Sequence, residues 1–165
     1  ICSNKKLTDF PVTAAADEDR VHKLEKAIGS IKGYDFVIFD SPPSLGLLTL
    51  NIMMAASEII IPVSLTYFAL DGCAEIIETV ENVKTNYGKK NLKVTWIVPT
   101  LYRHTRLVAS IIYKLRYFFG EKVTETVIGM NVAIDEAQSF GQTIWEYSPR
   151  SPGAQMLEAL AKEIA

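Results

Sequence analysis

The sequence predicts an α/β fold: a doubly wound, mainly parallel sheet with helices on both faces. Two observations lead to this prediction. Short apolar runs at residues 36–39, 59–63 and 94–98 have the composition of strands buried on both faces. Longer segments with apolar residues at helical spacing separate these runs. Because no repeat, low-complexity stretch or linker divides the chain, we expect residues 1–165 to form a single domain.

The first half of the chain contains three expected helices. Asp17 is a candidate cap for a helix that runs toward Gly33, and residues 44–57 are apolar on nearly every side, which is typical of a buried helix. Asp71 is expected to begin a third helix, which Gly88 ends. Each expected helix therefore adjoins one of the apolar runs.

The second half continues the alternation of strand and helix. Residues 106–119 are expected to be helical, and residues 123–128 and 143–145 are expected to be short strands. Ser151 is the expected cap of a final helix, with Pro152 at its first position. The expected inward positions of the helix at 106–119 are Leu107, Ile111, Leu115 and Phe118.

Composition restricts the classes of function. The net charge of −2 argues against a wholly basic nucleic-acid binder, although it allows a local basic patch. The two cysteines have no metal-site spacing, which favours a reducing cytoplasm, and Cys73 is expected to be a small buried thiol. Glu58 interrupts the longest apolar stretch, so no membrane span is expected. Ile1 in place of Met suggests a cleavage site or the start of a fragment.

A carboxylate follows the first apolar run directly. In open α/β sheets ligands bind at the carboxyl ends of strands, and Asp40 ends the run at residues 36–39. A hydrophobic strand that ends in Asp is the Walker B arrangement, in which the carboxylate holds Mg²⁺ directly or through water. The alternative is a loop aspartate that caps the following helix.

The residues around Asp40 extend this pattern into a longer motif. Residues 34–51 read YDFVIFDSPPSLGLLTLN, which resembles the Walker B and switch II segment of ParA/Soj-type partitioning ATPases, a class of P-loop NTPases with a deviant Walker A motif. The resemblance begins at about Phe10. It continues through residues 61–63, 67–72, 119–123, 136–141, 147–151 and 160–163.

The resemblance implies roles for individual residues. Asp40 would be the magnesium-side carboxylate, and a turn stiffened by two prolines would sense the γ-phosphate; the alternative is a rigid turn with no such role. The turn residues are Ser41, Pro42, Pro43, Ser44 and Gly46. Four loop residues would lie against the nucleotide base, although such residues are also common in plain turns. They are Pro99, Thr100, Met130 and Asn131.

The phosphate-binding part of the family pattern has no counterpart here. The Gly-rich loop with its two lysines is absent, and so are the strand and helix on either side of it. We therefore expect ATP and Mg²⁺ to be cofactors of the full-length family member and to be absent from this chain alone. Whether the chain is an enzyme stays open at this point, since the family hydrolyses ATP and this chain is expected to be inactive by itself.

A local excess of positive charge lies between Leu101 and Lys122. Five basic residues face only one acidic residue there, a local charge of +4. Relatives bind DNA without sequence specificity through surface arginines, which makes Arg103 and Arg106 the candidate DNA-binding residues. The alternative is a solvated helix face. Met130 and Ala133 stand in a loop where relatives commonly carry arginine, which predicts weaker DNA binding.

Taken together, the resemblance implies a segment of an ATPase for chromosome or plasmid partitioning. It would act through ATP-dependent homodimerisation and non-specific binding of double-stranded DNA, with a ParB-like centromere-binding protein as partner and a cytoplasmic, nucleoid-associated location. A MinD-like or other cargo-positioning ATPase is the first alternative, although the last helix is not basic as a membrane-targeting helix would be. A non-enzymatic remnant that acts as an interaction module is the second.

Overall fold

The computed structural model describes residues 7, 9–42 and 44–165, which form two compact units. The first unit comprises the described residues up to Ile59 together with Thr79–Lys93, and the second comprises Ile60–Glu78 and Val94–Ala165. The single domain inferred above stays a prediction. Among the described residues, no helix has both the length and the apolar composition to cross a membrane.

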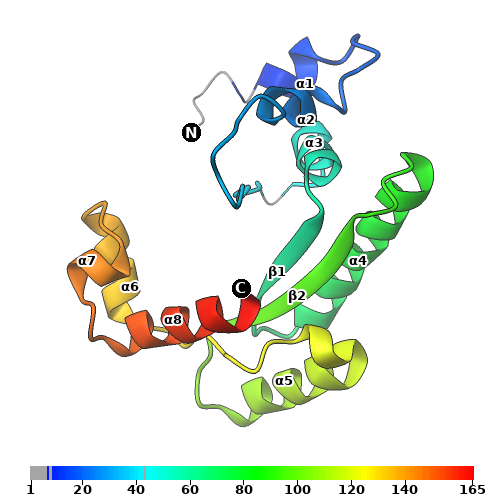
Figure 1. Cartoon of the computed structure of the whole chain (residues 1–165). Coiled ribbons are helices and arrows are strands. Elements are labelled where there is room, and N and C mark those ends of the chain that lie inside the picture. The colour runs from blue at the N-terminus through cyan, green and yellow to red at the C-terminus, as the bar shows by residue number, and fades with distance from the viewer. Residues whose placement is uncertain (1–6, 8, 43) are drawn as a thin grey trace. The chain divides into compact units, whose positions relative to one another are not determined.

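The first unit is mainly helical. It contains α1 (Phe10–Thr13), α2 (Lys23–Ile28) and α3 (Leu47–Ala55), and α3 packs against both α1 and α2 (Figure 1). Asp17 does not cap α2 as predicted, because its carboxylate accepts a hydrogen bond from the amide of Asp19 and pairs with Lys23. The helix also ends before Gly33, which lies beyond it at a positive φ of 83°.

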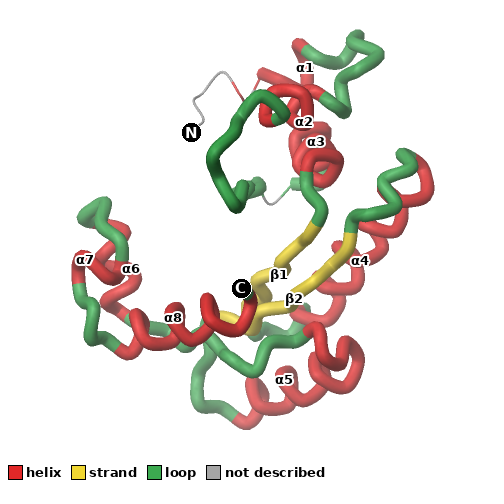
Figure 2. Tube along the Cα trace, in the orientation of Figure 1, coloured by secondary structure: helices red, strands yellow, loops and turns green. Residues whose placement is uncertain are grey.

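A parallel sheet lies at the centre of the second unit. Strands β1 (Glu58–Ser64) and β2 (Lys93–Thr100) are parallel neighbours, and the amide of Leu65 donates to the carbonyl of Thr100 at 3.3 Å (Figure 2). The region predicted as a third strand, residues 123–128, forms one isolated parallel bridge with β2, between Val123 and Ile97, and does not form a named strand. Ile97 of β2 and Leu115, farther along the chain, are fully buried. The predicted α/β fold with a parallel sheet is confirmed.

Helices α4 (Ala69–Asn86) and α5 (Arg106–Phe119) follow β1 and β2 in the predicted alternation. The 3₁₀ turn η2 (Gly120–Lys122) and helices α6 (Val132–Ser139), α7 (Ile144–Tyr147) and α8 (Pro152–Ile164) then follow one another without a further strand among the described residues. The predicted cap of α8 is confirmed, since the Ser151 hydroxyl accepts from the amide of Ala154 at 3.2 Å. Helices α6, α7 and α8 share a small core formed by Ala137, Ile144 and Ala154.

The strand predicted at residues 36–39 does not form among the described residues. This segment is a loop (Figure 2). Phe36 is 77% and Ile38 is 91% exposed. A strand that is buried on both faces needs a neighbouring strand to pair with its backbone, and no described strand pairs with these residues. The apolar run therefore lies open to solvent.

The strand predicted at residues 143–145 is also wrong. Thr143 instead caps α7: its hydroxyl accepts from the amide of Glu146, and the Glu146 carboxylate accepts from the amide of Thr143 at 2.8 Å. This reciprocal capping box satisfies two backbone donors locally and outweighs the strand propensity of Thr, Ile and Trp.

Two of the four inward positions predicted for α5 are confirmed. Ile111 and Leu115 are buried, whereas Leu107 is 58% and Phe118 is 65% exposed. The buried stripe follows Val108, Ile111 and Leu115, at i, i+3 and i+7, so a narrower face than predicted meets the sheet.

Candidate functional site

The Asp40 segment lies in the first unit, in the loop between α2 and α3. Asp40, Ser41 and Ser44 are exposed, Pro42 is half-buried, and Pro43 lies outside the described residues. Gly46 precedes α3 as its N-cap residue in an extended conformation. The Thr49 hydroxyl, one turn into α3, donates to the carbonyl of Ser44 and fastens the end of the loop to the helix.

Asn51 is the last residue of the motif at residues 34–51, and no role was predicted for it. Its side chain is fully buried, and its amide nitrogen donates to the carbonyls of Arg20 at 2.8 Å and Leu47 at 2.9 Å. Its oxygen accepts from the amide of Leu24 at 3.2 Å. Asn51 therefore holds the start of α2 against α3. The available signal was a lone amide in the middle of an otherwise apolar helix.

The four residues proposed for the nucleotide base lie in the second unit on two segments that the structure brings together. The carbonyl of Pro99 accepts from the amide of Ile128 at 2.9 Å, which joins the end of β2 to the segment that leads to Met130 and Asn131. Pro99 is fully buried and Thr100 is half-buried. Met130 is half exposed, so it is the most accessible of the four.

Asn131 is held against the start of α8. Its oxygen is buried and has no hydrogen-bond partner within the described ranges. A Cβ atom built on Gly153 would lie 2.7 Å from this oxygen and 2.9 Å from Ile134 Cγ1. Only a glycine therefore fits at this point of α8 without displacing its neighbours.

The described residues do not by themselves fit Mg-ATP. They contain no group of three or more His, Cys, Asp or Glu side chains that could hold a metal ion, and Asp40 is a single exposed carboxylate. The sequence also lacks the Gly-rich lysine loop that would cradle the phosphates.

The basic loop, residues 101–106, follows β2 directly. Arg103 and Arg106 are exposed, and neither forms an ion pair with a carboxylate in the part of the chain that the structure describes. Arg103 Nε instead donates to the sulfur of Met130 at 2.7 Å. Arg116 differs, because its guanidinium pairs with the Glu125 carboxylate at 3.0 Å. The two candidate DNA-binding arginines thus keep their full positive charge available to a ligand.

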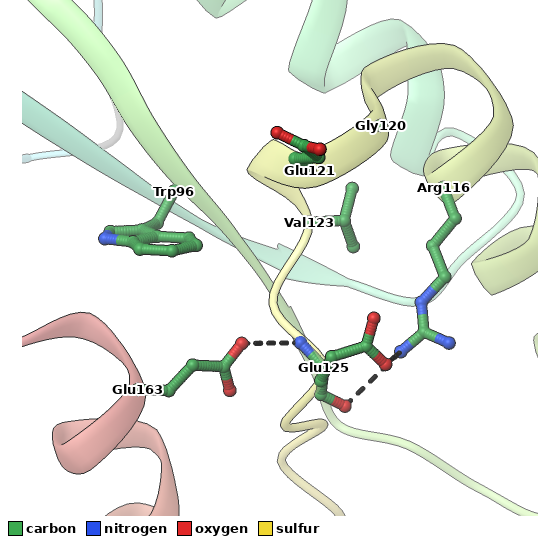
Figure 3. A pocket seen from close by; sticks show the side chains of 7 residues that line it. All are labelled: Trp96, Arg116, Gly120, Glu121, Val123, Glu125 and Glu163. Atoms are coloured by element: carbon green, nitrogen blue, oxygen red, sulfur yellow. Dashed lines mark hydrogen bonds and ion pairs between the residues drawn. The ribbon is translucent and has the colours of Figure 1, made fainter.

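A cavity of about 450 Å³ in the second unit is lined by Trp96, Arg116, Gly120, Glu121, Val123, Glu125 and Glu163 (Figure 3). The Glu163 carboxylate accepts from the amides of Glu125 at 2.6 Å and Thr126 at 2.9 Å. Burial raises the pKa of Glu163, but the hydrogen bonds from Thr126 and Glu125 and the nearby charge of Arg116 outweigh burial and lower that pKa. Glu163 therefore connects the end of α8 to the segment after η2 by hydrogen bonds.

Cys73 is a small buried thiol, as predicted. It is 1% exposed, and burial raises its pKa to about 11. A thiol with so high a pKa carries almost no thiolate near neutral pH.

Comparison with known proteins places the chain among partitioning ATPases. It is 43% identical over 134 residues to the chromosome-partitioning ATPase Soj of Thermus thermophilus, covering 81% of this chain and 53% of that protein. It is 38% identical to Soj of Treponema pallidum, covering 96% of this chain and 63% of that protein. The chain thus spans between about half and two thirds of the length of these relatives.

A solved structure shows the same fold. Cobyrinic acid a,c-diamide synthase from Mycobacterium smegmatis, crystallised with bound ADP and magnesium, has a TM-score of 0.77 and 25% identity. The match covers 97% of this chain and 58% of that protein. Residues 1–94 match the AAA domain family AAA_31. The chain therefore belongs to the AAA_31 family of AAA domains and is a homologue of the Soj and ParA chromosome-partitioning ATPases.

Proposed function

We propose that the protein to which this chain belongs is an ATP-dependent switch in the partitioning of chromosomes or plasmids. Mg-ATP favours a homodimer that holds double-stranded DNA without sequence preference, and a ParB-like centromere-binding protein stimulates hydrolysis and release. The similarity to the chromosome-partitioning ATPases Soj supports the partitioning role. The protein would act in the cytoplasm, associated with the nucleoid.

Two groups of residues in this chain would contribute to the nucleotide site. Asp40 is the carboxylate for the magnesium ion, and the turn at residues 41–46 responds to the γ-phosphate. The hydrogen bond from the Thr49 hydroxyl to the Ser44 carbonyl supports this role, because a movement of the turn would also move the start of α3. Pro99, Thr100, Met130 and Asn131 lie on the base side. The phosphate loop would come from sequence outside this chain.

One observation carries the DNA-binding part of the proposal. Arg103 and Arg106 are exposed without a carboxylate partner among the described residues, on a chain whose net charge is negative. A surface arginine that is already paired gains little from a phosphate, whereas an unpaired one releases counterions when it binds DNA. Two such arginines within the six residues of the basic loop therefore favour binding of the DNA backbone there over a solvated face.

A salt titration of the full-length protein with a slowly hydrolysed ATP analogue tests the proposal. Each arginine that no longer neutralises a phosphate should flatten the slope of log affinity against log salt by about 0.9, so Arg103→Glu with Arg106→Glu should flatten it by about 2 per protomer. Lys32→Glu with Lys90→Glu is the matched control, because both lysines are exposed and the change in charge is the same.

The outcomes separate the two interpretations of the basic loop. Weaker DNA binding and a flatter slope for the arginine variant alone, with ATP-dependent dimerisation intact, would support the interface. Equal slopes and affinities for the wild type and the arginine variant would show that residues 101–106 are a solvated face. Stimulation of ATP turnover by the cognate centromere-binding protein would test the partner separately.

A further inference from the structure

The side chain of Arg103, in the basic loop, contacts the sulfur of Met130. We propose that Met130 is a positioning residue of the DNA interface: its sulfur holds Arg103 so that the terminal nitrogens of the guanidinium face a DNA phosphate. The proposal rests on the DNA-binding role of the loop proposed above. It assigns a function to a methionine whose side chain is half exposed.

Backbone hydrogen bonds also join the segments that carry Arg103 and Met130. The amide of Tyr102 donates to the carbonyl of Ile128 at 3.1 Å, and the amide of Met130 donates to the carbonyl of Tyr102 at 3.2 Å. These bonds continue the parallel pairing of Tyr102 with Gly129. Leu101, just before them, has a positive φ of 55°, which is costly for a residue with a side chain. The loop therefore keeps an unfavourable backbone conformation beside Met130.

The Met130 segment is braced from its other side by α8. The amide of Gly129 donates to the sulfur of Met156 at 3.2 Å. A Cβ on Gly129 would lie 3.5 Å from the same sulfur, so the two segments are in close contact. Met130 thus projects from a segment that is held on both sides, and this gives Arg103 a fixed point to bind.

The chemistry of the contact suits a phosphate ligand. Arg103 Nε–H points to the Met130 sulfur at 2.7 Å, which leaves the four N–H groups of the two terminal nitrogens for other partners. A thioether is a neutral acceptor, so it orients the guanidinium without cancelling its charge, in contrast to the Glu125 carboxylate beside Arg116. Two terminal nitrogens held in this way match the oxygens of a phosphate. Orienting a long side chain before DNA arrives lowers the entropy cost of binding.

A double-mutant cycle on the full-length protein with the ATP analogue tests the proposal. Met130→Leu removes the sulfur and nearly conserves volume. Arg103→Lys removes the Nε–H and keeps the charge. Met130→Leu should weaken DNA affinity by about 2-fold to 5-fold, the low end for one net hydrogen bond because a thioether is a weak acceptor, and leave the salt slope unchanged. In the Arg103→Lys background the same substitution should have no effect on DNA affinity.

Each result decides for or against the positioning role. An unchanged affinity of the Met130→Leu variant would overturn it. An equal weakening in the wild-type and Arg103→Lys backgrounds would also overturn it, because Met130 would then act through the fold or through the nucleotide base and not through Arg103. If Arg103→Glu with Arg106→Glu weakens DNA binding and Met130→Leu does not, only this inference fails. If the arginine variant binds DNA as the wild type does, the DNA-binding role of the loop and this inference fail together.

Discussion

Replacing Asn51 should destabilise the first unit more than any exposed substitution in it. The side chain is fully buried and makes three hydrogen bonds, to Arg20, Leu24 and Leu47. Asn51→Ala removes all three at once. It leaves the amide of Leu24 and the carbonyl of Arg20 without the buried side chain that is their partner.

The expected magnitude follows from the number of bonds. Each net hydrogen bond contributes about 1 kcal/mol, so the free energy of unfolding should fall by about 3 kcal/mol. That is a large fraction of the total stability of an ordinary domain. The matched control is Asn91→Ala, because Asn91 is an exposed asparagine of the same unit. Its free energy of unfolding should change by less than about 0.5 kcal/mol.

Urea denaturation followed by circular dichroism gives the free energies, and amide hydrogen exchange locates the effect. The Leu24 amide should exchange much faster in the Asn51→Ala variant, because Asn51 is its acceptor. The reasoning would be refuted if Leu24 exchanged at the same rate in both proteins. A decrease in stability no larger than that of Asn91→Ala would refute it too.

Four further predictions concern the rest of the chain. Glu163→Gln should destabilise the second unit above pH 4.5, the ordinary pKa of a glutamate. The folded pKa is lowered, so the stabilisation is present above the unfolded pKa and is lost as the pH falls through the folded one; urea midpoints of variant and wild type should converge in acid, and a gap that is constant with pH would contradict this. Gly153→Ala should cost about 1–3 kcal/mol in urea denaturation through crowding of Asn131, whereas Gly72→Ala, with nothing within 4 Å of its Cβ, should be neutral or stabilising. Ile38→Asp should reduce self-association of the chain in light scattering, because Ile38 is 91% exposed, and a wild-type chain that is already monomeric would rule this out. Calorimetric titration of the chain with Mg-ATP should show no tight binding, whereas micromolar binding abolished by Asp40→Ala would reveal a complete site.

Many signals that lie within a few consecutive residues were read correctly from the sequence, although Asp17 does not cap α2 and the capping box of Thr143 was missed. Helix α5 has the predicted bounds, Arg106–Phe119, and Ser151 with Pro152 begins α8. The runs at residues 59–63 and 94–98 became parallel strands. The motif at residues 34–51 pointed to the family that the relatives show. Local periodicity, capping residues and motif spacing carry such information without knowledge of distant contacts.

Features that depend on partners far along the chain were decided only by the tertiary structure. The apolar run at residues 36–39 has the composition of a buried strand, but a strand forms only where a neighbouring backbone pairs with it. Nothing local shows that Asn51 binds residues 27 and 31 positions away, or that the sulfur of Met130 meets Arg103 from 27 positions away. The sequence alone thus determined the family and most of the helices and strands. Burial, hydrogen-bond partners and the free charge at the basic loop followed from packing, because each depends on which distant groups come within a few ångströms.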